Sequence, residues 1–361
     1  LSKLNFFFDI NNNLIFSSKI VSLFFFYLGL FFLIKFLKIE FKKDINYFIF
    51  VLVILINPFT LFWSTSVNTE TLLFFLICCS LYNFKKNIDN PNFYNLFFLL
   101  ICSSLAMLIK IHLSFAFFFA IWLNYLNYNN IKNKILRTTT LILSLSLSLI
   151  WYLNINWPFE WSDNIINENV LTIYLSQMIK YMSPYYLVEI LIKKIFFEML
   201  SIIFVPFFIL GVIFYFKKIR LALLIILFSI VITNYFLFYH SYYWVSIFPF
   251  YTLIIYLGFI YLKKKFKYFS DFTILHTCLF IFIIYYLVPP FFYQHFTYKY
   301  EINKVSELKP LFSLLDRNVN IENIEASNII QQNFDKKEIL IIFSDYTQHL
   351  VLPFFTNKQF K

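Results

Sequence analysis

Charged residues and glycine are both scarce in this chain of 361 residues. Only 14% of the residues are charged and three are glycine, whereas 60% are hydrophobic, which gives a mean hydropathy of +0.72. Soluble globular domains carry about 25% charged residues, so this composition excludes an ordinary soluble protein. Apolar runs of roughly 18 residues recur, and a helix of that length crosses a hydrocarbon core of about 30 Å. We therefore expect an integral membrane protein.

Motifs for nucleotides and metals are also missing from the sequence. It contains no glycine-rich phosphate loop, no HExxH sequence and no zinc-ligand spacing, which argues against a nucleotide-driven transporter and a membrane metalloprotease. The four cysteines lie in apolar runs, so we interpret them as core- or lipid-facing residues and expect no disulfide framework: Cys78, Cys79, Cys102 and Cys278. The 53 phenylalanines are discounted as a functional signal, because abundant Phe, Ile, Asn and Lys are typical of an A/T-rich genome.

The apolar runs predict an all-α polytopic membrane domain over residues 1–293, because backbone polar groups inside a bilayer must be satisfied within helices. About ten transmembrane helices are expected, at residues 14–37, 47–63, 71–84, 94–109, 113–126, 138–153, 195–216, 221–239, 245–262 and 272–292. A polar extracytoplasmic loop is expected at about 154–190. Residues 294–361 are interpreted as a small extracytoplasmic C-terminal α/β domain, in which KVSELKPLFSLL has helical spacing and EILIIFS resembles a buried strand.

Lysine and arginine predict the orientation of these helices. When the helices alternate in direction, five basic segments fall on one side, which the positive-inside rule makes cytoplasmic: 35–43, 85–86, 132–137, 217–220 and 263–267. The basic pair Lys193 and Lys194 is an exception to this rule, because it falls on the outer side. Short outer elbows then follow at 64–70, 110–112 and 239–244. The net charge of +11 is explained by this topology, so no nucleic-acid partner is expected.

Five polar residues near the expected outer ends are candidates for a binding site: Lys19, Glu70, Lys110, His112 and His240. Charges near membrane depth are rare and often functional. The lysines suit a lipid-linked phosphate, Glu70 suits a sugar hydroxyl, and His240 suits a phosphate or a proton. The alternative interpretation is structural, because lysines near helix ends extend to lipid headgroups and a glutamate stabilises a helix N-terminus.

Three segments carry a resemblance to a known family. In residues 11–86, Lys19 opens a run, Pro58 lies near the end of the next, and Ser64 and Glu70 occupy the elbow that follows. The segment SSLAMLIKIHLSFAFFFAIWL contains Lys110, and YHSYYWVSIFPFYTLIIYLGF contains a proline after an aromatic elbow. In this order the features resemble the glycosyltransferase C superfamily, in its protein-mannosyltransferase and aminoarabinose-transferase branch, with Lys110 at the basic position of a "Leu-Ala … Thr-Lys" helix pair.

The resemblance implies a membrane glycosyltransferase of the bacterial inner membrane. Such an enzyme transfers a sugar from a polyprenyl-phosphate-linked donor to a lipid or glycan acceptor on the extracytoplasmic face. A carboxylate deprotonates the acceptor, and cations stabilise the departing phosphate. Lys110 and Lys19 are assigned to the cation role, Glu70 to substrate positioning, and His112 and His240 to substrate binding. No cofactor is expected, and the sequence leaves a divalent metal open. Membrane lipids are further expected partners.

Two departures from the family pattern shape these expectations. The family's catalytic acid lies in the first outer loop, before a His-Pro helix, and Asp9 is a poor match for it. An arginine expected near residues 239–244 is absent, with His240 in its neighbourhood. We therefore expect the catalytic acid to lie upstream of residue 1 in an N-terminally truncated chain. The alternatives are a polysaccharide polymerase or lipid-linked glycan flippase, and third a secondary transporter.

Overall fold

The computed structural model describes residues 10–41, 45–57, 60, 64, 69–125, 131–154, 156–160, 165–169, 176, 179, 188, 202–233, 241–266 and 269–287. The chain divides into two compact units, one formed by residues 1–21 and 299–361 and the other by residues 22–298. The described helices and strands lie in the second unit, except for residues 10–21, which belong to the first. The expected C-terminal α/β domain lies outside the described residues.

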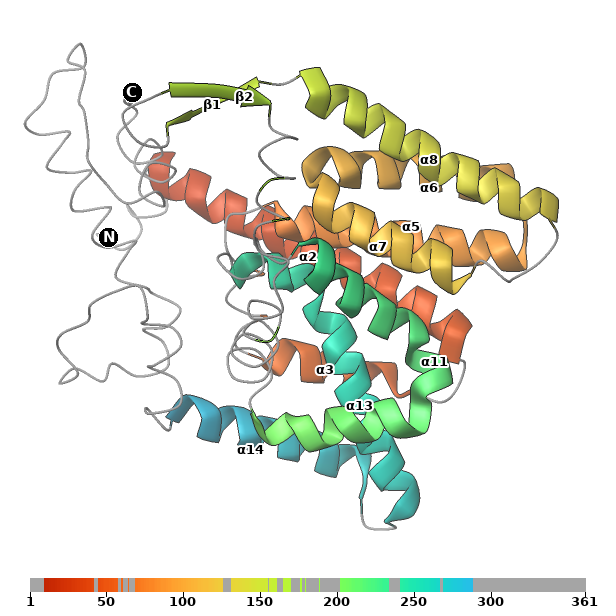
Figure 1. The fold of residues 1–361 in the computed structure, drawn as a ribbon. Helices are drawn as coiled ribbons and strands as arrows, with labels where there is room; N and C mark the ends of the chain where they lie inside the picture. The colour runs from red at the N-terminus through yellow and green to blue at the C-terminus, as the bar shows by residue number, and fades with distance from the viewer. Residues whose placement is uncertain are drawn as a thin grey trace, which may run out of the picture. The chain divides into compact units, whose positions relative to one another are not determined.

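Nearly all of the described chain is helical (Figure 1). The elements are α2 (Ile10–Phe41), α3 (Tyr47–Ile56), α5 (Glu70–Asp89), α6 (Phe93–Ile109), α7 (Ile111–Asn124), α8 (Ile131–Asn154), β1 (Asn156–Glu160), β2 (Ile165–Asn169), η2 (Ile202–Phe204), α11 (Val205–Ile232), η3 (Ser241–Ser246), α13 (Phe248–Lys265) and α14 (Asp271–Leu287). Within this part, two helical segments are long and apolar enough to cross a membrane, Ser17–Phe41 and Lys134–Asn154.

Helix α11 differs from the prediction of two runs separated by a basic loop at 217–220. It continues through those residues and bends at Tyr215, whose φ of −121° and ψ of 17° are not helical. Figure 1 shows the two arms of α11 on either side of this bend. Lys and Arg are good helix formers, and neither glycine nor proline occurs from Lys217 to Arg220, so the helix resumes directly after the bend.

The polar loop after α8 also contains structure that the sequence did not predict. Strands β1 and β2 form an antiparallel pair in which Asn156 lies opposite Asn169 and Glu160 lies opposite Ile165. Pro158 within β1 lowers the strand signal in the sequence, since proline cannot donate to a strand ladder. The pair occupies the first part of the loop expected at 154–190.

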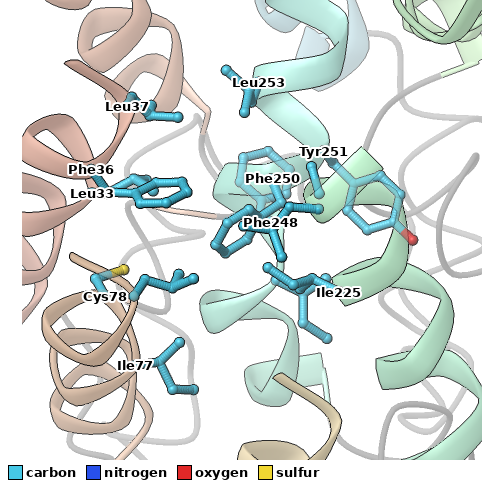
Figure 2. Close-up of a cluster of buried hydrophobic side chains, with 14 of the residues drawn as sticks. Leu33, Phe36, Leu37, Ile77, Cys78, Ile225, Phe248, Phe250, Tyr251 and Leu253 are labelled. Carbon is cyan, nitrogen blue, oxygen red and sulfur yellow. The ribbon is translucent and has the colours of Figure 1, made fainter. Parts of the chain in front are cut away.

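Helix α13 is buried along most of its length. Every residue from Phe248 to Ile260 is buried, as expected of a helix that is apolar on all sides. Figure 2 shows side chains from α2, α5, α11 and α13 converging on one cluster: Leu33, Phe36, Leu37, Ile77, Cys78, Ile225, Phe248, Phe250, Tyr251 and Leu253.

All three glycines lie where two helices touch. A Cβ on Gly211 would overlap the carbonyl oxygen of Ile254 in α13, and one on Gly258 would overlap the carbonyl oxygen of Phe207 in α11. A Cβ on Gly29 would instead meet the ring of Phe74 in α5. Small residues allow helix backbones to approach closely in membrane proteins. The two glycines therefore allow the backbones of α11 and α13 to approach closely.

Helices α5, α6 and α8 are joined by small polar side chains. The sulfur atoms of Cys79 in α5 and Cys102 in α6 are 3.5 Å apart, and the hydroxyls of Ser103 in α6 and Ser144 in α8 are 2.6 Å apart. All four cysteines are buried, as predicted for packing residues. These contacts give the three helices a defined register.

Candidate functional site

The site forms where α5 begins and where α6 meets α7. Glu70 is the first residue of α5, and Lys110 is the single non-helical residue between α6 and α7, with a φ of −151° and a ψ of 93°. The Lys110 backbone N–H donates to the carbonyl of Ala106 at 3.0 Å, while its carbonyl accepts from the N–H of Ser114 at 3.1 Å. Lys110 thus closes one helix and opens the next, which fixes the direction in which its side chain leaves.

The ammonium of Lys110 donates to Oε1 of Glu70 in a close ion pair. The Glu70 side chain is 1% exposed and that of Lys110 is 14% exposed, so both charges are largely removed from solvent. A buried charge is costly unless it is paired, and removing one partner leaves the other uncompensated. The positive end of the α5 dipole further stabilises the Glu70 carboxylate.

Tyr243 of η3 covers this ion pair. The Nζ atom of Lys110 lies 3.5 Å from the centre of the Tyr243 ring, which is a cation–π contact. The ring of His112, in the first turn of α7, lies 5.5 Å from the same ring centre and is tilted by 31°. Both His112 and Tyr243 are 5% exposed. The Tyr243 ring is therefore a wall shared by the lysine and the histidine.

Tyr152, near the end of α8, supports the turn from the other side. Its hydroxyl donates to the carbonyl oxygens of Leu108 at 3.1 Å and Ile109 at 3.4 Å. These are carbonyls of the last turn of α6, which have no partner within their own helix. Tyr152 therefore ties the end of α8 to the residue before Lys110.

Burial governs the charge of Lys110. It lowers the pKa of this lysine from 10.5 to about 7. An anion beside a buried ammonium acts in the opposite direction and favours the charged form. The positive charge of Lys110 at neutral pH consequently depends on an anion beside it. In this structure that anion is Glu70, and a phosphate oxygen has the same effect.

The structure brings three of the five predicted site residues together: Glu70, Lys110 and His112. His240 lies outside the described residues. Lys19 is a half-buried residue of α2 in the other compact unit, and its position relative to the ion pair is not described. No cluster of three or more His, Cys, Asp or Glu side chains that could hold a metal occurs within the described residues.

Sequence reasoning missed Tyr152 and Tyr243. Both are tyrosines at the end of an apolar run, where a ring packs among helices while the hydroxyl reaches a polar group. A tyrosine at the end of an apolar run indicates a contact with a polar segment between helices, but it does not identify which residue it contacts.

Comparison of the chain with protein-family models, with curated proteins and with solved structures found no match.

Proposed function

We propose that this chain is a membrane glycosyltransferase that uses a polyprenyl-phosphate-linked sugar and transfers it to a lipid or glycan hydroxyl on the extracytoplasmic face. One observation carries the proposal. The three segments whose sequences resemble the glycosyltransferase C superfamily contribute Glu70, Lys110 and Tyr243, and the Lys110 ammonium contacts both the Glu70 carboxylate and the Tyr243 ring. Segments separated by 40 and then 133 positions thus contribute to a single charged cluster.

The proposed topology has about ten transmembrane helices in a bacterial inner membrane. Helix α5 supports it, because polar contacts occur near both of its ends. Beyond Glu70 at its start, Lys85 near its end pairs with Glu40 of α2 at 3.2 Å, and Tyr125 after α7 donates to Glu40 at 3.3 Å. Fifteen residues of helix separate Glu70 from Lys85, which is about 22 Å. This spacing is most of a hydrocarbon core of about 30 Å, which supports a topology with Glu70 toward one interface and Lys85 toward the other.

The chemistry proposed for Lys110 is stabilisation of the departing phosphate. The acceptor oxygen attacks the anomeric carbon, the bond from that carbon to the phosphate oxygen breaks, and the electron pair leaves with the polyprenyl phosphate. An ammonium has three N–H donors, so a lysine can hold a carboxylate and a phosphate oxygen together. Glu70 orients the ammonium and maintains its positive charge. The attraction between that ammonium and the phosphate oxygen grows as negative charge develops on the phosphate. The acceptor proton goes to a carboxylate base that we assign to no described residue.

Reconstitution of the purified full chain into liposomes tests the proposed function. The liposomes carry a polyprenyl-phosphate-linked sugar with a radiolabel in the sugar and a glycolipid acceptor. We expect the label to move from the donor to the acceptor. Movement of the intact donor between leaflets without transfer would contradict the proposal and support a flippase.

Cysteine labelling tests the orientation on which the proposal depends. Single cysteines placed at Ser66 and Ser241 are expected to react with a membrane-impermeant maleimide added outside intact cells. A cysteine at Lys217 is the matched control and is expected to react only after the membrane is permeabilised. Labelling of Ser66→Cys or Ser241→Cys from the cytoplasmic side would place the cluster on the wrong face for the proposed reaction.

A further inference from the structure

Helix α2 carries an exposed apolar stripe that ends in lysines. Phe24, Tyr27 and Phe31 are 59%, 49% and 48% exposed and recur at helical spacing, and Lys35 and Lys38 continue the same row. From Phe24 to Lys35 the helix rises by about 16 Å. That length is roughly half of a hydrocarbon core of about 30 Å, which is the depth of one lipid leaflet.

The end of the stripe meets α5 at Tyr82. The Lys35 ammonium lies 4.4 Å from the centre of the Phe31 ring and 5.7 Å from that of the Tyr82 ring. The ammonium of Lys86 in α5 lies 5.6 Å from the same Tyr82 ring centre. Two cations from different helices therefore share one aromatic ring, and their separation cannot exceed the sum of their two distances to it.

The charge of this cation pair is not balanced within the described part of the chain. The carboxylates of Glu40 and Asp89 both lie on Lys85, at 3.2 Å and 3.8 Å. Among the described residues, no carboxylate lies within salt-bridge distance of Lys35 or Lys86. Like charges repel, and an anion that contacts both ammonium groups removes that cost.

We propose that an anionic glycerophospholipid binds at this place. Its acyl chain lies along Phe24, Tyr27 and Phe31, and its phosphate lies between Lys35 and Lys86 beside the Tyr82 ring. The apolar stripe and the cation pair are continuous, so a molecule with an acyl chain and a phosphate matches both at once. In the proposed orientation this end faces the cytoplasm, whose leaflet attracts basic side chains by about 1 kcal/mol each. The inference does not depend on glycosyl transfer.

Native mass spectrometry of the full chain in detergent tests this inference. Phosphatidylglycerol is titrated against phosphatidylcholine, and the wild type is expected to retain phosphatidylglycerol preferentially. The double variant Lys35→Gln/Lys86→Gln is expected to bind it about 25-fold more weakly, since each lysine contributes roughly a factor of five. The matched control is Lys217→Gln/Lys265→Gln, which removes the same charge from exposed positions of α11 and α13. The single variant Lys86→Gln, at an exposed position, is expected to lose about five-fold.

Three results would overturn the inference. Equal occupancy of the wild type by phosphatidylglycerol and phosphatidylcholine would show no preference for an anionic lipid. An equal loss of phosphatidylglycerol affinity in the two double variants would mean that the overall positive charge, and not the place of Lys35 and Lys86, determines binding. Inorganic phosphate that displaces phosphatidylglycerol at a similar concentration would show that the acyl chain contributes nothing. Loss confined to the Lys35 and Lys86 variants, with inorganic phosphate ineffective, is the supporting outcome.

Discussion

The ammonium of Lys110 lies 3.5 Å from the centre of the Tyr243 ring while it donates to Glu70. The lysine is therefore held between a carboxylate and an aromatic face, with only 14% of its side chain exposed. This arrangement makes the pair sensitive to any change at either charge, because each group is the compensation for the other.

The ion pair predicts a strongly non-additive mutant cycle. Glu70→Gln leaves Lys110 buried without its carboxylate, and Lys110→Met leaves Glu70 without its cation. Breaking a buried pair from one side costs about 3–5 kcal/mol of the free energy of unfolding. The double variant removes both charges, so it is expected to be more stable than either single variant. Thermal unfolding of the four proteins in one detergent measures the cycle, and additive losses would contradict the buried pair.

The close crossing of α11 and α13 predicts that replacing Gly258 by alanine destabilises the protein more than replacing Gly29. Gly258→Ala places a methyl group against the carbonyl of Phe207, a backbone atom that cannot move without shifting a helix. Overpacking of this kind costs about 1–3 kcal/mol or more. Gly29→Ala is the matched control, because the atoms closest to its methyl group belong to the Phe74 side chain, with the Phe75 Cα further away at 3.2 Å. Melting temperatures are expected to fall more for Gly258→Ala, and the reverse order would refute the crossing.

The packing of α5 on α6 predicts a specific cross-link. The sulfur atoms of Cys79 and Cys102 are 3.5 Å apart, so mild oxidation with copper phenanthroline is expected to join them. Cys79→Ser is expected to abolish the product, while Cys78→Ser, one position away, is expected to leave it unchanged. Mass spectrometry of the digested protein identifies the linked peptides. A link through Cys78 would show that the register of the two helices is wrong.

The helices were largely predictable because their signal is local. Long apolar runs marked α2 and α8, and α6 matches its predicted run to within one residue at its start. The bend at Tyr215 was not predictable from the same signal. A basic KKIR sequence is compatible with both a loop and a helix, and tertiary packing decides between them.

The site was predictable in its members and not in its contacts. Glu70 and Lys110 were candidates because charges are rare in such a sequence, yet nothing in the sequence indicates that residues 40 positions apart form an ion pair. The same limit applies to Tyr243, which is one of 26 tyrosines. The sequence shows only that glycine is scarce. It does not show that each of the three glycines lies where two helices are in close contact.

Donor affinity and transfer rate of a Lys110→Ala protein test the central proposal most directly. Removing one group that stabilises a developing oxyanion typically lowers the rate about 10²–10³-fold. We expect such a loss in the liposome transfer assay, together with weaker binding of the polyprenyl-phosphate-linked donor. Lys265→Ala, which removes an exposed lysine near the end of α13, is expected to keep wild-type values. A folded Lys110→Ala protein that transfers sugar at the wild-type rate with unchanged donor affinity would contradict the account.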